Sequence, residues 1–209
     1  MSVIFTNKTA TKILDEYTCA LSLDISRKST GVALYESGVL QLYILSLDSK
    51  YSKTDNMWEA QLKSEFKNTL SKLVKGKEFD LVVVENTING NNAITNKELT
   101  LLNSVFDDLV IEGVVKLKNK NSLVRPFPNV WRKELKALVN SVSNVSSISA
   151  SNTKVLVEKL LSKLGFMYVI ENNDISESKK KSSGYYDICD SIGMLIAYMY
   201  KTSSLNTKH

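Results

Sequence analysis

CALSLDI at residues 19–25, GVALYE at residues 31–36 and LQLYILSL at residues 40–47 follow one another with only short breaks. Each segment is apolar and has the length of a β-strand, with Gly31 and the run Glu36-Ser37-Gly38 marking the turns. Strands joined by tight turns pair with their neighbours in an antiparallel meander. This part of the chain therefore predicts three antiparallel strands.

Helices and strands are expected to alternate after the meander. Residues 58–73 carry apolar side chains at helical spacing, and Gly76 follows as a helix stop. Residues 79–84 are apolar without alternation, which is typical of a strand buried on both faces. The further expected elements are a helix at 102–117, a strand at 123–127, a helix at 128–138, a loop at 140–152, a helix at 153–164, a strand at 167–170 and a helix at 187–200.

This order predicts an α/β fold: a mixed sheet of the RNase H-like type, in which the meander is joined by parallel strands and helices cover both faces. With 209 residues and 43% hydrophobic composition, the chain is expected to form one domain over residues 1–209. Residues 1–16 are expected to be an N-terminal extension and residues 201–209 a tail.

The composition excludes several kinds of chemistry. The single histidine, His209, is the last residue, so histidine-based triads, HExxH zinc sites and histidine general bases are excluded. Two cysteines, Cys19 and Cys189, are too few for a disulfide framework and indicate a reducing compartment. Any reaction must therefore use carboxylates, lysines or hydroxyls. The formal charge of +5 is compatible with an anionic partner.

No stretch approaches the roughly 20 consecutive apolar residues of a membrane helix, and the N-terminus lacks the apolar core of a signal peptide. We therefore expect a soluble, cytoplasmic protein with no membrane partner. If a phage encodes it, that cytoplasm is the one of the bacterial host.

Four acidic residues lie at the ends of predicted strands or at the start of a predicted helix. Asp24 ends the first strand, Glu85 ends the buried strand, and Asp187 and Asp190 share one face of the last helix. Carboxylates brought together in a buried site repel one another and require protonation or a cation. A set of hard oxygen ligands favours Mg²⁺, with Mn²⁺ as a substitute, and two such ions per site are the arrangement that cleaves phosphodiesters.

Each acid also has a plainer interpretation. Asp187 could interact only with the positive end of the helix dipole, Glu85 could be a solvated strand-end residue, and Asp24 could favour the turn that follows it. The four together are harder to explain as coincidence, and we interpret them as one catalytic and metal-binding site.

These motifs resemble those of the RuvC family of Holliday junction resolvases, in its small phage-type form. The match comprises LSLDIS at residues 21–26 with TGVA at residues 30–33, VVVEN at residues 82–86, and DICDSIG at residues 187–193. The resemblance implies that Asp24, Glu85, Asp187 and Asp190 form the metal-binding tetrad. It also implies a crossover junction endodeoxyribonuclease that makes paired nicks near the branch point of four-way junctions.

The resemblance further assigns residues that contact DNA. Lys154 matches the basic residue that acts near the scissile phosphate, and either Lys133 or Lys136 matches a second functional lysine. Ile88 stands where many members have an aromatic residue that enters the junction. The run Lys179, Lys180 and Lys181 could contact DNA or could be a solvated loop.

Resolution of a junction needs two symmetric nicks, so we expect a homodimer, with the wide apolar stripe of residues 102–117 as the candidate interface. The same stripe could instead cover only the sheet. Three other functions stay open: another RNase H-like nuclease such as an RNase H or a transposase, a catalytically inactive DNA-binding factor, and an actin-like ATP-binding protein. The last is disfavoured because the chain has eight glycines and no glycine-rich nucleotide motif.

Overall fold

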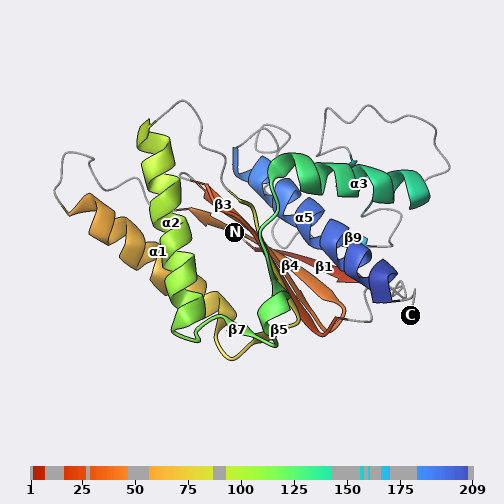
Figure 1. The fold of residues 1–209 in the computed structure, drawn as a ribbon, viewed down its shortest axis with the longest axis horizontal. Coiled ribbons are helices and arrows are strands. Elements are labelled where there is room, and N and C mark those ends of the chain that lie inside the picture. The colour runs from red at the N-terminus through yellow and green to blue at the C-terminus, as the bar shows by residue number, and fades with distance from the viewer. Residues whose placement is uncertain are drawn as a thin grey trace.

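The computed structural model describes residues 2–7, 17–26, 29–46, 57–86, 93–142, 156–157, 160, 166–169 and 183–206. These residues form a sheet with helices on both faces (Figure 1). The sheet has seven strands in the order β8-β6-β2-β3-β4-β1-β9. Their bounds are β1 Ser2–Asn7, β2 Cys19–Asp24, β3 Ser29–Glu36, β4 Val39–Ser46, β6 Leu81–Val84, β8 Leu123–Val124 and β9 Phe166–Val169.

The predicted meander is confirmed. Strand β2 pairs with β3 and β3 pairs with β4, both antiparallel, and Ser37 and Gly38 form the second turn with positive φ angles of 48° and 87°. A type I′ hairpin turn requires positive φ at both central positions, which explains the compact Ser-Gly pair. Strands β6 and β8 then extend the sheet parallel to β2. The mixed sheet expected of an RNase H-like fold is therefore present.

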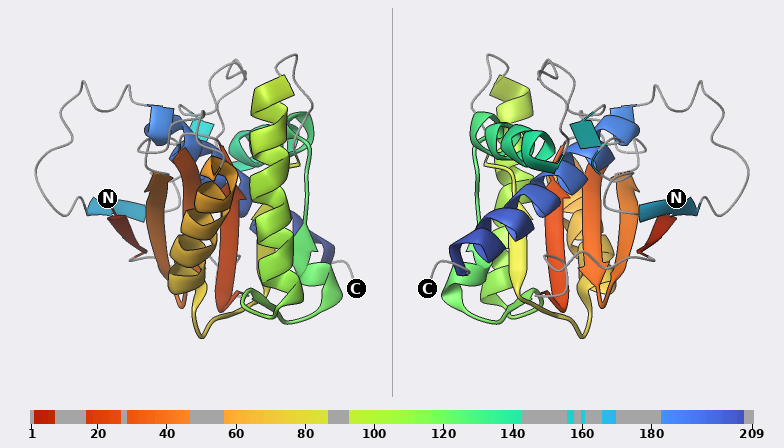
Figure 2. Two further views of the ribbon diagram at one scale, coloured as in Figure 1. Left: turned by 90° about the vertical axis from the view of Figure 1, so that its left-hand side faces the viewer. Right: turned by 90° about the vertical axis from the view of Figure 1, so that its right-hand side faces the viewer.

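Four long helices divide between the two faces, as the side views show (Figure 2). Helices α1, Trp58–Val74, and α2, Ala93–Ile111, cover one face, and helices α3, Pro128–Val142, and α5, Ser183–Asn206, cover the other. Strand β6, which lies between β8 and β2, serves both cores, because Leu81 and Val83 pack toward α3 and α5 while Val82 and Val84 pack toward α1 and α2. Burial on both faces explains why this strand shows no alternation in sequence.

The second helix differs from its prediction at both ends. It begins at Ala93, before the first residue of the expected apolar stripe, and ends at Ile111 instead of Leu117. Gly113 has a φ of 70°, Val114 N donates to Leu109 O at 2.9 Å, and Gly113 N donates to Val110 O at 3.1 Å. This pair of hydrogen bonds is a Schellman motif, which terminates the helix.

The structure adds strands that the sequence did not predict and describes part of one predicted helix. Strand β1 lies inside the expected N-terminal extension and joins the sheet between β4 and β9. Strand β9 confirms the short strand expected near residues 167–170. A small second sheet, formed by β5, Glu78–Phe79, and β7, Lys116–Leu117, was not predicted. The helix expected at 153–164 is described only at residues 156, 157 and 160, which are helical and buried.

Both cysteines, Cys19 and Cys189, are buried, and neither takes part in a disulfide. Within the described part of the chain, no helix combines the length and the apolar character needed to span a bilayer.

Candidate active site

The strand register places Asp24 and Glu85 side by side. In the parallel pairing of β2 with β6, Leu23 lies opposite Val84, so the next residue of each strand is an acid. The pairing continues to this point, because Glu85 N donates to Leu23 O at 3.3 Å. Both acids therefore leave the sheet at the carboxyl ends of two adjacent parallel strands, β2 and β6, where α/β sheets bind their ligands.

The same two acids point to one face of the sheet. Side chains alternate along a strand, and Ala20 and Val83 belong to the core under α3 and α5. Asp24 and Glu85 are an even number of residues from these positions, so they share that face. Helix α5 lies on it and contributes Asp187 and Asp190.

Helix α5 begins at Ser183, one turn earlier than the sequence predicts, so Asp187 and Asp190 lie beyond its first turn. Because the dipole interaction fades after the first turn, Asp187 is not explained as a helix-start acid. The helix can approach the sheet closely because residue 31 is glycine. A Cβ there would lie 2.8 Å from Ile188 N and closer still to the main-chain carbonyl of Asp187. No side chain fits between β3 and this turn of α5.

The four carboxylates form one electrostatic cluster. Burial raises the pKa of Asp24 well above its usual value, and the nearby charges of Glu85, Asp190 and Asp187 raise it further. The side chain of Asp24 is partly accessible to solvent. Even so, protein atoms surround its carboxylate more closely than those of Glu85, Asp187 and Asp190. Burial also raises the pKa of Glu85, Asp187 and Asp190. Four acids that resist ionisation together are characteristic of a site that receives a cation.

Three of the acids each accept a hydrogen bond from a different donor. Trp131 Nε1 donates to Glu85 Oε2 at 2.6 Å, and Arg132 donates to Asp190 Oδ2 at 3.2 Å. Ser29 Oγ on β3 donates to Asp187 Oδ2. These donors oppose the effect of burial, and each lowers the pKa of its partner relative to burial alone.

The donor set fits a hard divalent cation, because it consists of carboxylate oxygens without histidine or cysteine. Among the described residues, no three acidic, histidine or cysteine side chains are already grouped tightly enough to hold a metal ion. Glu85, Asp190 and Asp187 are each held by a separate donor.

The structure places only part of the predicted DNA-binding set. Lys133 is exposed on α3 and Lys136 is partly buried one turn later on the same helix. Neither forms an ion pair that links it to the acids, so the choice between them stays open. Ile88, Lys154, Lys179, Lys180 and Lys181 lie outside the described residues.

Sequence reasoning missed the donors of the cluster. Trp131 begins the buried stripe of α3, which continues with Leu135, Leu138 and Val139. A tryptophan in such a stripe needs a partner for its N–H group, and this was the available signal. Ser29 and Arg132 left no comparable signal, because a serine in a turn and an arginine on a helix are common on any surface.

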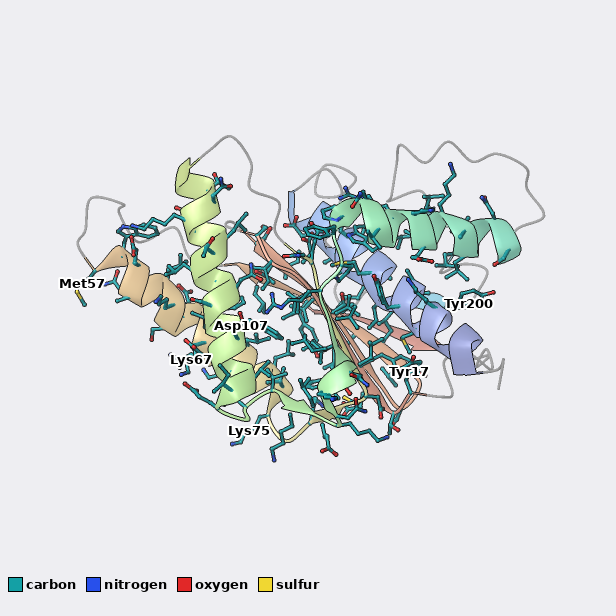
Figure 3. All side chains as sticks on the ribbon, in the orientation of Figure 1. Tyr17, Met57, Lys67, Lys75, Asp107 and Tyr200 are labelled. Atoms are coloured by element: carbon teal, nitrogen blue, oxygen red, sulfur yellow. The ribbon has the colours of Figure 1, made fainter. Side chains whose placement is uncertain are left out.

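Arg125, which follows β8, is bound to helix α2. Its guanidinium donates to Asn103 Oδ1 at 3.0 Å, forms an ion pair with Asp107, and lies 5.4 Å from the ring centroid of Phe106. Asp107 is labelled on α2 in Figure 3. This arginine therefore connects the sheet edge to α2.

No protein-family model and no curated protein sequence matches the chain. Solved structures do match. Thermus thermophilus RuvC in complex with a Holliday junction substrate aligns with a TM-score of 0.55 and 7% identity, over 90% of this chain and 96% of that one. The yeast mitochondrial Holliday junction resolvase Ydc2 aligns with a TM-score of 0.61 and 14% identity, over 94% of this chain and 85% of that one.

A second structure of Thermus thermophilus RuvC aligns with a TM-score of 0.50 and 9% identity, over 89% of this chain and 96% of that one. At these identities the similarity concerns the fold. The chain has the RuvC-type, RNase H-like fold, and the resemblance drawn from its sequence motifs is confirmed at that level.

Proposed function

We propose that this protein is a structure-selective endonuclease that hydrolyses phosphodiester bonds in branched DNA, four-way junctions above all. One observation carries the proposal: Asp24 and Glu85 at the carboxyl ends of β2 and β6 lie near Asp187 and Asp190 of α5, in a fold shared with junction resolvases. The same four residues were selected from the sequence by position and chemistry. Their convergence in space supports the assignment of a single site.

Asp24, Glu85, Asp187 and Asp190 would hold Mg²⁺, or Mn²⁺ in its place, as two ions per site, the arrangement that stabilises the attacking and leaving oxygens in phosphodiester cleavage. When bound, such ions stabilise the charge that develops on the phosphate oxygens. The protein contributes the acids, held on two strand ends and one helix. In the reaction, a water oxygen attacks phosphorus and the bond from phosphorus to the leaving sugar oxygen breaks.

Basic residues near the cluster would bind the DNA. Arg132 has a side chain that is 46% exposed and touches Asp190, so it stands at the rim of the site where a phosphate would enter. Lys133 lies next to it on the exposed side of α3. We place Lys136, Lys154, Lys179, Lys180, Lys181 and Ile88 in the same DNA-binding role as proposals from the sequence. Lys154 is also proposed to be catalytic, acting near the scissile phosphate.

Paired nicks would require a homodimer, because each chain provides one site and two strands must be cut symmetrically. The apolar stripe expected to form the interface is largely used within the chain. Leu102, Val105, Phe106 and Leu109 are buried against the sheet and α1, whereas Ile111 is 82% exposed. The dimer therefore needs an interface beyond the buried part of this stripe.

Cleavage of defined substrates by the purified chain tests the function. Labelled four-way, three-way and linear duplex DNA and an RNA·DNA hybrid of the same sequence would be incubated with Mg²⁺ or with EDTA. We expect Mg²⁺-dependent cutting of the four-way junction, at symmetric positions in opposing strands. Preferential cutting of the hybrid would indicate an RNase H instead, and equal cutting of linear DNA would contradict selection of branched structure.

Asp190→Asn is the matched control, because the substitution preserves side-chain shape and removes the charge. We expect this variant to bind the junction and not to cut it. Cutting at the wild-type rate in Mg²⁺ would show that Asp190 does not belong to the reacting site.

A further inference from the structure

Trp131 connects the core of the protein to the acidic cluster. Its side chain is fully buried, and its Nε1 atom donates to Glu85 Oε2 at 2.6 Å. The indole lies against Gly193 of α5, where an added Cβ would be 3.2 Å from the ring atom Cζ3. A rigid bicyclic side chain that is enclosed on this face has no freedom to follow a moving carboxylate.

Arg132, the next residue, lies over the indole ring. Its guanidinium carbon lies 4.8 Å from the ring centroid, and the same guanidinium donates to Asp190 Oδ2 at 3.2 Å. The first turns of α3 therefore contact both halves of the cluster: Trp131 holds the strand-end acid Glu85, and Arg132 holds the helix acid Asp190.

A carboxylate on a flexible glutamate side chain can rotate and present either oxygen to a cation. The indole N–H engages Oε2 of Glu85 and so leaves Oε1 as the oxygen that is free of this bond. Donors that orient a ligand from outside the metal site typically change metal affinity by about 10- to 100-fold when they are removed. A buried tryptophan also loses its own hydrogen bond if the glutamate turns away, which penalises the alternative rotamer.

We propose that Trp131 is a positioning residue that orients the Glu85 carboxylate for cation binding. The proposal rests on the proposed metal-dependent nuclease function and deepens it. Trp131 itself touches neither the DNA nor the cation, and it acts only through Glu85. Trp131 holds the Glu85 side chain in one orientation before the cation binds. Glu85 therefore loses less conformational entropy when it binds the cation.

The chain offers a direct probe, because it contains two tryptophans, Trp58 and Trp131. Trp58 begins α1 on the opposite face of the sheet. Only two indole N–H signals are therefore expected in a ¹⁵N–¹H NMR spectrum, and Trp58→Phe assigns them. In the metal-free protein, Glu85→Gln should shift the Trp131 signal and leave the Trp58 signal in place. Mg²⁺ should likewise move only the Trp131 signal.

Removal of the donor without loss of volume tests the role itself. In the Trp58→Phe background, Trp131 would be replaced by β-(3-benzothienyl)alanine, in which sulfur takes the place of the N–H group. Calorimetry without DNA should show the Mg²⁺ dissociation constant rising about 10- to 100-fold. At saturating Mg²⁺, kcat for junction cleavage should fall much less than this, since the acids themselves remain. Trp58→Phe alone should change neither quantity.

The outcomes separate the two proposals. If the analogue binds Mg²⁺ as tightly as its parent while the parent cuts junctions, the positioning role is wrong and the nuclease stands. If the analogue loses Mg²⁺ affinity but the parent cuts no branched DNA, the nuclease proposal is wrong and the positioning role stands. If Glu85→Gln leaves the chemical shift of the Trp131 indole N–H signal unchanged, the positioning role is wrong.

Discussion

Gly31 of β3 lies against the main-chain carbonyl of Asp187, at the turn of α5 that carries the first helix acid. The contact is between two backbones, and a Cβ at residue 31 would also lie 2.8 Å from Ile188 N. Backbone atoms in a packed helix cannot move aside as a flexible side chain can. The distance between α5 and the strand end at Asp24 therefore depends on the absence of a side chain at residue 31.

We expect Gly31→Ala to destabilise the protein and to weaken cleavage. Overpacking of a tight core costs about 1–3 kcal/mol or more, which corresponds to about 2–4 °C in Tm per kcal/mol for a chain of this size. Displacement of α5 also moves Asp187 and Asp190 away from Asp24. Thermal unfolding and the Mg²⁺ dependence of cleavage would measure the two effects.

Gly193→Ala is the comparison for this test. An added methyl group there would meet side-chain atoms of Leu135, Trp131 and Val157, at 3.1 to 3.2 Å. Side chains can yield by a few tenths of an ångström, so we expect a smaller loss of stability than for Gly31→Ala. Equal losses would mean that the backbone contact at Gly31 has no special importance.

Asp24→Asn should stabilise the metal-free protein at neutral pH while abolishing cleavage. Burial and the neighbouring acids raise the pKa of Asp24, so its charged form is disfavoured in the folded state. Asparagine removes that charge and keeps the shape of the side chain. Mg²⁺ should raise the Tm of the wild type, because it binds only the folded state, and should have a much smaller effect on the variant. A variant less stable than the metal-free wild type at pH 7 would contradict the assignment.

The pH dependence of stability should have the corresponding sign. The folded state holds the Asp24 proton more tightly than the unfolded state, whose pKa is near 3.9. The free energy of unfolding of the metal-free wild type should therefore fall as pH rises from about 4 through the raised pKa. Glu85, Asp187 and Asp190 contribute in the same direction. Denaturant unfolding at several pH values should show a shallower fall for Asp24→Asn.

Much of this arrangement follows from local sequence. Asp24 and Glu85 each come directly after an apolar strand, and parallel pairing of those strands forces the two acids together. The three-residue spacing of Asp187 and Asp190 places them on one face of any helix. These relations depend only on secondary structure and sheet register, which apolar patterning specifies.

Other features depend on contacts between distant segments, and patterning does not specify them. The bond from Trp131 to Glu85 requires the crossing of α3 over the sheet, and the bond from Ser29 to Asp187 requires the docking of α5. Strand β1 was missed because its two partners, β4 and β9, lie far from it in the sequence, so no tight turn marks its pairing. The early end of α2 was encoded by Gly113, whose role as a helix terminator only the positive φ reveals.

Arg132→Gln should lower stability slightly and cleavage more strongly. The guanidinium lowers the pKa of Asp190, Glu85 and Asp24 relative to burial alone, so its loss raises all three. Because Arg132 is nearly half exposed and solvent screens its charge, we expect a stability loss below about 1 kcal/mol. Lys63→Gln is the control, since this exposed lysine on α1 has the same charge and lies on the opposite face of the sheet. The free energy of unfolding and the rate of junction cleavage are measured for both variants. Equal losses in the two variants would indicate a general charge effect.

Light scattering at micromolar concentration measures the molar mass of the protein and so tests the dimer. The time courses of the first and second nicks on a supercoiled cruciform test whether two sites act within one complex. We expect a dimer and near-simultaneous nicks, because two sites related by a two-fold axis act within one complex. Ile111→Asp probes the exposed end of the former candidate interface. A monomer that still makes fully paired nicks would refute the homodimer.

The arginines bear on how the enzyme would recognise its substrate. Of the 27 lysines and arginines, only Arg27, Arg125 and Arg132 are arginines, and arginine is the residue most used for bidentate reading of guanine. Arg125 is bound to Asn103 and Asp107 on α2, and Arg132 is bound to Asp190. Two of the three are therefore already engaged within the protein. Lysines act on phosphates as point charges and carry little sequence information.

We accordingly expect the enzyme to select branched DNA by shape, with little dependence on base sequence. Affinity for junctions should fall steeply as salt rises, because lysine contacts to phosphates release counterions. Permutation of the bases at the centre of a fixed junction should change the cleavage rate only a few fold, below the tenfold that corresponds to about 1.4 kcal/mol. On a mobile junction, cuts should spread over several positions around the branch point. If one tetranucleotide were cut about a hundredfold faster than its permutations, or about 2.8 kcal/mol better, a base-reading residue would exist, and Arg125→Gln and Arg132→Gln would be the first variants to examine for loss of that preference.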